Sequence, residues 1–163
     1  MFVRSASERD LPAIRELLVE TRQATYDAIY GEHQIAELTD DWHSIASLKA
    51  RLSRPNSEFV VVDDGERLGG MAFATATGDQ TVVVLHQFYV HPACQGRGLG
   101  RLLLEEIEGC FPDASRIRVE VEAANAPALA FYEANGFVRT GTAEMSGPGD
   151  FEVAAVVLEK PLV

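Results

Sequence analysis

The first third of the chain carries its hydrophobic residues at helical spacing. A short strand is predicted at Phe2–Ser5, and Ser7–Asp10 then has the spacing of a capping box that begins a helix. Apolar residues recur every three or four positions after it, which predicts a helix to about Arg22. The same spacing over 26–54 predicts a second helical region that ends before Pro55.

The pattern then changes to that of a sheet. A β-branched run, a stretch with small residues and a third apolar stretch follow one another, separated by turns rich in aspartate and glycine. This succession predicts an antiparallel meander with strands at about 59–62, 68–77 and 81–90. A glycine-rich loop comes next, and a helix with one apolar face begins near Leu99.

The last third alternates between strands and one short helix. Residues 116–122 alternate strictly between apolar and charged side chains, which predicts a half-buried strand. Asn125 is expected to cap a helix, and Asn135-Gly136 is typical of a left-handed helix stop. Two final strands are predicted at about 137–146 and 151–160.

Length and composition agree with one domain. The chain has 163 residues, of which 47% are hydrophobic, so it can bury a substantial core. The order of elements, βααβββαβαββ, predicts a single mixed α/β domain over residues 1–163. Its sheet is expected to be mostly antiparallel, with about six or seven strands flanked by helices.

Charge and targeting signals exclude several classes of function. With 14 basic and 25 acidic residues the net charge is −11, whereas nucleic-acid-binding surfaces need clustered lysine and arginine. No signal peptide is predicted, and the apolar runs are too short for a transmembrane helix, so we expect a cytoplasmic protein that binds no membrane. Neither the histidines nor the two cysteines have metal-ligand spacing, so no metal site is predicted.

The stretch richest in chemical information is residues 90–101, with the sequence VHPACQGRGLGR. Its glycines allow successive backbone N–H groups to turn toward one point, and the start of the following helix adds partial positive charge. Arg97 and Arg101 add full charges, and the arrangement suits a pyrophosphate. The glycines form GxGxG instead of the dinucleotide-binding GxGxxG, and the Walker lysine is absent. The pattern Gln-x-x-Gly-x-Gly is the remaining candidate.

Three segments resemble the GCN5-related N-acetyltransferase (GNAT) superfamily. Residues 95–100 look like its acetyl-CoA pyrophosphate loop, and residues 88–92 look like the end of the strand that pairs with the pantetheine arm. Residues 125–137, NAPALAFYEANGF, are similar to its downstream helix and the exit into a strand. Around 117–137 the likeness is greatest to ribosomal-protein N-terminal acetyltransferases. The resemblance implies the GNAT fold and acetyl-CoA as acyl donor.

The same resemblance implies which residues bind the donor. Backbone N–H groups of the glycine loop would hold the pyrophosphate, Gln95 would fix the loop, and the preceding strand would hydrogen-bond pantetheine. Asn125 would touch the cofactor arm, cap its helix, or do both. The expected cofactor-binding residues are Phe88, Tyr89, Val90, Gln95, Gly96, Arg97, Gly98, Leu99, Gly100, Arg101, Asn125 and Tyr132.

Acetyl transfer to an amine also needs an acid and a base. By resemblance Tyr132 lies near the CoA sulfur, and its phenol keeps a proton at neutral pH that it can share with the departing thiolate. The alternative for Tyr132 is a core aromatic residue. Glu120 aligns with a glutamate that serves as base in the ribosomal-protein subgroup, and otherwise belongs to a solvated face. His86 is the rival base, with a structural histidine or a water chain as the alternatives.

The acceptor remains open in the sequence. The family usually places it between the N-terminal helices and the loop before the last strand, where acids and aromatics suit a cationic amine. The expected substrate-binding residues are Tyr26, Tyr30, Glu32, Trp42 and Asp150. We therefore expect an N-acetyltransferase acting on a primary amine, with a non-catalytic acyl-CoA sensor as the alternative. The oligomeric state stays open, a homodimer included.

Overall fold

The computed structural model describes residues 2–30, 45–96, 98–146 and 152–162. In these ranges seven strands form one sheet in the order β1-β2-β3-β4-β5-β7-β6. The pair β4–β5 is parallel, and the other neighbouring pairs are antiparallel. The strands are β1 (Phe2–Ser5), β2 (Ser57–Asp63), β3 (Leu68–Ala76), β4 (Val82–Val90), β5 (Arg116–Glu122), β6 (Val138–Ser146) and β7 (Glu152–Pro161).

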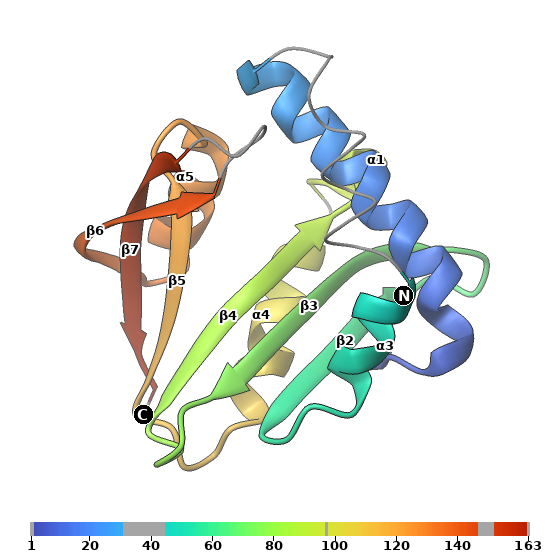
Figure 1. Cartoon of the computed structure of the whole chain (residues 1–163), viewed down its shortest axis with the longest axis horizontal. Helices are drawn as coiled ribbons and strands as arrows, with labels where there is room; N and C mark the ends of the chain where they lie inside the picture. The colour runs from blue at the N-terminus through green and yellow to red at the C-terminus, as the bar shows by residue number, and fades with distance from the viewer. Residues whose placement is uncertain (1, 31–44, 97, 147–151, 163) are drawn as a thin grey trace.

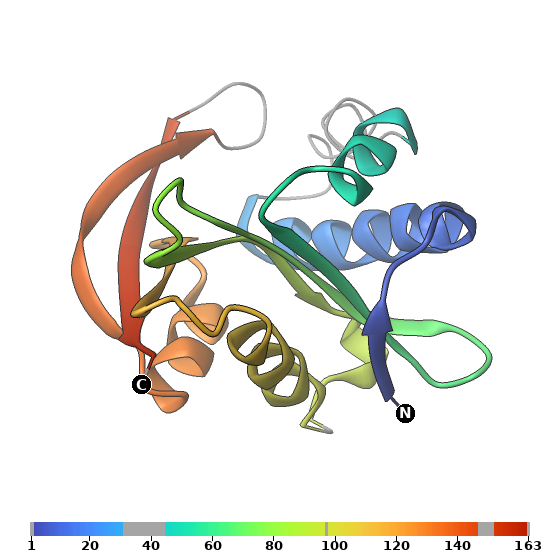
Figure 2. The same ribbon diagram turned by 90° about the horizontal axis from the view of Figure 1, so that it is seen from below.

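Helices cover both faces of the sheet (Figures 1 and 2). One face carries α1 (Leu11–Tyr30) and α3 (Ile45–Leu52), and the other carries α4 (Leu99–Gly109) and α5 (Ala126–Ala134). Two 3-10 turns, η1 (Glu8–Asp10) and η2 (Pro92–Cys94), precede α1 and follow β4.

Each face of the sheet has its own apolar core. On the α1/α3 face, leucines and an isoleucine of the helices pack against β2 and β3, with Phe59, Phe73 and Met71 almost fully buried. On the α4/α5 face, residues such as Leu103 and Ile107 pack against the alternate side chains of the same strands. The alternation of strand side chains divides the molecule into two layers of helix with the sheet between them.

An ion-pair network joins the N-terminal elements. The guanidinium of Arg4 donates to both carboxylate oxygens of Asp10 at 2.8 Å and to Asp63 Oδ2 at 2.9 Å. The backbone N–H of Ser7 also donates to Asp10, as the capping-box spacing predicted, and the Ser7 hydroxyl donates to the same oxygen. The hydrogen bonds from Arg4 hold the pKa of Asp10 far below its usual value.

The predicted fold class is confirmed, with changes at element ends. The helix expected to end near residue 22 continues to Tyr30, and the second helical region is described as α3, since residues 31–44 lie outside the described part. In the portions of the chain that the structure describes, no helix is both long and apolar enough to cross a membrane.

Candidate functional site

The sheet opens between β4 and β5. These strands pair only over Val82–Leu85 and Arg116–Val119. Beyond that point β4 stays with β3, while Glu120–Glu122 stays with β7, so the two strands diverge (Figure 1). An unpaired strand edge presents backbone N–H and C=O groups, which can bind an extended chain as an added strand would.

A β-bulge lies at the point of divergence. Gln87 is opposite Phe73 and Leu85 is opposite Ala74, so His86 has no residue opposite it in β3. Such a bulge bends its strand and increases the local twist, which turns β4 away from β5. The bulge therefore puts His86 at the start of the gap.

His86 is held between polar and aromatic neighbours. Its Nε2 lies 2.7 Å from Thr75 Oγ1, and its ring centroid lies 5.8 Å from that of Phe73. Desolvation and the positive charges of Arg54 and Arg51 lower the pKa of His86, against the opposing effect of the nearby Glu120 carboxylate. The imidazole is therefore mostly neutral near pH 7, as a proton acceptor must be.

Glu120 faces the same region from β5. Its side chain is exposed, and Oε1 accepts a hydrogen bond from Arg118 Nη2 at 3.1 Å. Leu85 is paired with Val119, so the residues that follow them, His86 and Glu120, both lie where the two strands separate. The fold thus brings together the two residues that sequence reasoning offered as alternative bases.

The glycine loop has the backbone conformation that only glycine adopts readily. Gly96 has φ of +81° and Gly98 has φ of +76°, both in the left-handed region. A Cβ atom on either residue would meet nothing within 4 Å, so the space beside the loop is open to a ligand. Arg97, between them, lies outside the described residues.

The start of α4 adds donors at the same place. The first N–H group that bonds within the helix is that of Leu102, which donates to the carbonyl oxygen of Gly98. The N–H groups before it, in the first turn, have no acceptor within the helix. Together with the helix dipole they favour an anion. Arg101 forms an ion pair with Glu105, whose Oε1 lies 3.2 Å from Arg101 Nε. Both side chains are exposed.

Two contacts fix this loop to its neighbours. Gln95 Nε2 donates to the carbonyl oxygen of Val90 at 3.2 Å, which ties the loop to the end of β4. Gly100 lies so close to Phe131 that an added Cβ would be 2.9 Å from its ring. The loop is therefore positioned by β4 and by α5 together.

Tyr132 is buried in the cluster on the α4/α5 face. It is 5% exposed, and its ring packs against Phe131, Phe137 and Phe88 at centroid distances of 5.3, 5.1 and 6.0 Å. Burial raises the pKa of Tyr132, so the phenol stays protonated. Asn125 caps the same helix by accepting from the Ala128 N–H at 3.3 Å.

Sequence reasoning missed a contact between α1 and the loop after β4. His91 Nδ1 accepts from the Ala93 N–H at 3.0 Å, and His91 Nε2 lies 2.5 Å from Glu20 Oε2. This contact fixes the entrance of the glycine loop relative to α1. Residues 71 positions apart have no local pattern that could have indicated it.

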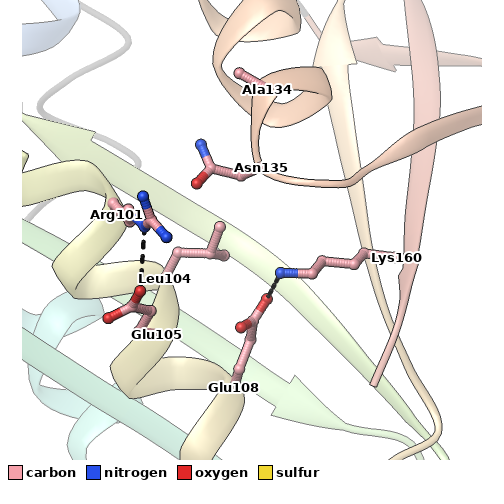
Figure 3. Close-up of a pocket in the computed structure, with 7 residues that line it drawn as sticks. All are labelled: Arg101, Leu104, Glu105, Glu108, Ala134, Asn135 and Lys160. Atoms are coloured by element: carbon pink, nitrogen blue, oxygen red, sulfur yellow. Dashed lines mark hydrogen bonds and ion pairs between the residues drawn. The ribbon is translucent and has the colours of Figure 1, made fainter. Parts of the chain in front are cut away.

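A pocket lies beside the glycine-loop helix, between α4, the end of α5 and β7 (Figure 3). Its volume is about 250 Å³. The four charged side chains of its lining pair with one another, Arg101 with Glu105 and Lys160 with Glu108, so the lining is neutral as a whole. Among the described residues, no three or more histidine, cysteine or acidic side chains form a metal-binding group.

The expected acceptor residues cannot be placed as side chains. Tyr26 and Tyr30 belong to α1, but their side chains are outside the described part of the chain. Glu32, Trp42 and Asp150 also lie outside the described residues.

Comparisons with known proteins agree on one family. Residues 11–137 match the model of the acetyltransferase (GNAT) family. The chain is 34% identical to N-alpha-acetyltransferase RimI of Mycobacterium tuberculosis over 112 residues, covering 68% of this chain and 70% of that protein. It is 26% identical to the peptidyl-lysine N-acetyltransferase YiaC of Escherichia coli, covering 83% and 82%.

A similar solved structure contains coenzyme A. The PaiA N-acetyltransferase of Thermoplasma acidophilum, in complex with coenzyme A, has a TM-score of 0.83 and 22% identity, covering 98% of each chain. At this identity the likeness concerns the fold.

Proposed function

Because the chain belongs to the acetyltransferase (GNAT) family, whose members use acetyl-CoA, we propose that it moves an acetyl group directly from the thioester to a primary amine. N-acetyltransfer is the activity of the family and of the named relatives. The observation that carries the direct route is the gap between β4 and β5, which opens beside His86 and Glu120 and leads to the glycine loop. We further propose that residues 1–163 form one catalytic domain.

The residues around the gap fit acetyl-CoA. The positive-φ glycines and the free N–H groups at the start of α4 suit the pyrophosphate, and Gln95 keeps the loop attached to β4. Beyond Leu85 the side of β4 that faces the gap has no partner strand among the described residues, and the backbone groups of Phe88 and Val90 on that side suit the amide groups of pantetheine. Bound acetyl-CoA supplies the reactive carbonyl and the thiol leaving group.

The amine must lose a proton to react. An alkylamine has a pKa of about 10.4, so near pH 7 it is mostly ammonium and a base must accept the proton. Burial and two nearby arginines lower the pKa of His86, so its imidazole is neutral and can accept the proton. The Glu120 carboxylate, which interacts electrostatically with His86, is the other candidate base. We propose that one of them accepts the proton, directly or through water.

The departing sulfur and the developing oxyanion need donors. The Tyr132 phenol, kept protonated by burial, would donate a hydrogen bond to the thiolate as the C–S bond breaks. A backbone N–H on the side of β4 that faces the gap, that of Val90, would stabilise the oxyanion. The N–H of Tyr89 faces β3, because His91 N–H donates to the carbonyl oxygen of Gly69 and the N–H groups of alternate residues point to the same side. The attack forms one C–N bond and breaks one C–S bond, and no acetylated enzyme is formed.

The acceptor is proposed to be cationic before it reacts. The net charge of −11 supports this, since it raises the local concentration of cations. The two curated relatives are named for an α-amine and a lysine side chain, so polypeptide amines are the first to test.

The test is a panel of amines with acetyl-CoA, read by thiol release and product mass. The panel contains peptides with a free α-amine, peptides with a free lysine, polyamines and amino acids. We expect thiol release that depends on the amine, with one acetyl group gained per thiol. Binding of acetyl-CoA without release on any amine would support the sensor alternative.

The base is assigned by pH–rate profiles of Glu120→Gln and His86→Ala. The profile of kcat/KM in the wild type is expected to fall toward low pH as the base becomes protonated. The variant that lacks the base loses this limb. If His86 is the base, Glu120→Gln instead moves the limb to lower pH, because the carboxylate raises the pKa of His86.

A further inference from the structure

Gln87 carries a polar atom that the fold does not use. Its Oε1 is buried and has no hydrogen-bond partner among the described residues. Most buried side-chain oxygens in folded proteins are hydrogen-bonded. Burial removes their hydrogen bonds to water, and without a protein partner this loss costs free energy. The amide of Gln87 is therefore unfavourable for the free protein and needs another explanation.

The side chain of Gln87 lies on the face of the sheet opposite α4. It follows the bulge residue His86 on β4, where β4 has left β5. Residues directly opposite in an antiparallel pair lie on one face, and its partner Phe73 belongs to the core under α1 and α3. Gln87 thus faces the layer of α1.

A second unpaired polar atom lies in that layer. Thr21, on α1, is 3% exposed, and its Oγ1 also has no hydrogen-bond partner within the described ranges. Helix α1 contacts β4 in the fold. The layer of α1 and α3 thus holds more than one buried side-chain oxygen that the described residues leave without a hydrogen bond.

In the proposed function acetyl-CoA binds on the α4/α5 face of the sheet. The glycine loop begins α4, and Tyr132 belongs to the cluster on that face. An amine that attacks the thioester in the gap has to come from the other face, which is the face of Gln87 and His86.

We propose that Gln87 Oε1, which is covered in the free protein, is uncovered when the acceptor binds. It then accepts a hydrogen bond from the N–H of the attacking amine and so orients the nitrogen lone pair toward the thioester. This inference rests on the proposed function and adds a substrate-binding residue to it. A neutral primary amine has two N–H bonds. One proton leaves to the base during acetylation, and the other stays on nitrogen throughout and remains bound to Gln87.

The proposal predicts a preference for primary over secondary amines. In an N-methylated acceptor the one remaining N–H proton must leave, so no N–H is left for Gln87. N-methylation and loss of the Gln87 oxygen then remove the same hydrogen bond. Their effects on kcat/KM should overlap instead of multiplying, as for any two changes to one contact.

The test uses the full chain with the Gln87→Met variant. Methionine is similar in shape and has no buried amide, so removing an unpaired acceptor should raise Tm by about 2–4 °C. The control is Gln80→Met, at an exposed turn between β3 and β4, which should leave Tm and turnover unchanged. A fall in Tm of Gln87→Met would overturn the proposal, because it would show that the amide has a stabilising partner in the free protein.

Kinetics supply the second readout. The probes are a peptide with a free N-terminal alanine, a peptide with one free lysine, and the N-methyl form of each. With the primary amine, Gln87→Met should lower kcat/KM about three- to tenfold, the value of one hydrogen bond between neutral groups. The penalty of N-methylation should shrink by the same factor in this variant.

The outcomes separate this inference from the proposed function. If Gln87→Met has the same turnover and the same N-methyl penalty as the wild type, the role of Gln87 is contradicted and the acetyltransferase proposal stays intact. If the wild-type protein acetylates none of the amines, the proposed function is contradicted. The Tm measurement decides whether the amide is unpaired in either case.

Discussion

Replacing Gly98 by alanine is expected to weaken acetyl-CoA binding far more than it lowers the stability of the fold. Gly98 precedes α4 with φ of +76°. An L-residue in this region is strained by about 1–2 kcal/mol. Alanine also has less conformational entropy than glycine in the unfolded chain, and this offsets up to about 1 kcal/mol of the strain. The net loss is about 1 kcal/mol, or about 2–4 °C in Tm.

The effect on binding follows from the open space beside the loop. No atom lies within 4 Å of a Cβ built on Gly98, so the added methyl group would occupy space that the pyrophosphate needs. Loss of one hydrogen bond to a charged group weakens binding by about 1.5–3 kcal/mol, which is roughly a tenfold to hundredfold increase in Kd.

A matched control lies in the turn between β2 and β3. Gly65 has φ of +96°, and a Cβ atom there also meets nothing within 4 Å. Gly65→Ala should therefore have a similar strain and a similar fall in Tm, with unchanged affinity for acetyl-CoA. Calorimetric titration with acetyl-CoA measures the affinity without any acceptor. Equal affinities of the two variants would refute the assignment of the loop.

Three further predictions concern other parts of the molecule. Tyr132→Phe keeps the buried ring and should lower kcat at least tenfold with little change in acetyl-CoA affinity; unchanged kcat would remove the phenol from the chemical step. Asp10→Asn should lower the free energy of unfolding at pH 7 by about 2 kcal/mol, because Asp10 loses charged hydrogen bonds with Arg4. The lowered pKa of Asp10 gives stability that is full above its unfolded pKa of about 3.9 and is lost as the pH falls, so denaturation curves should show this difference shrinking below pH 4. Gly70→Ala puts a Cβ 2.8 Å from a backbone oxygen of β4, so it should lower Tm and acetyl-CoA affinity together, whereas Gly78→Ala, with open space around it, should change neither.

Local patterns predicted the local elements well. The glycines of the loop, the Asn125 cap and the alternation in β5 each depend on a few neighbouring residues, and each lies where the sequence placed it. The end of α1 was misjudged, because the residues before Tyr30 lack the regular apolar spacing that marks its first turns.

Long-range features had no comparable signal. The insertion of β7 between β5 and β6, and the parallel pairing of β4 with β5 that makes the gap, depend on how whole strands pack. The bulge at His86 and the contact of His91 with Glu20 join positions far apart in sequence. The unpaired oxygen of Gln87 becomes visible only when its surroundings are known.

The most direct test of the donor site is amide NMR of the labelled protein during titration with coenzyme A. We expect the largest shifts at the amides of Gly96, of Gly98–Arg101 and of Phe88–Val90, with the turn at Gly65 unchanged. Shifts confined to the pocket beside Lys160, or spread over the turn at Gly65, would contradict the assignment of the glycine loop and the β4 edge as the acetyl-CoA site.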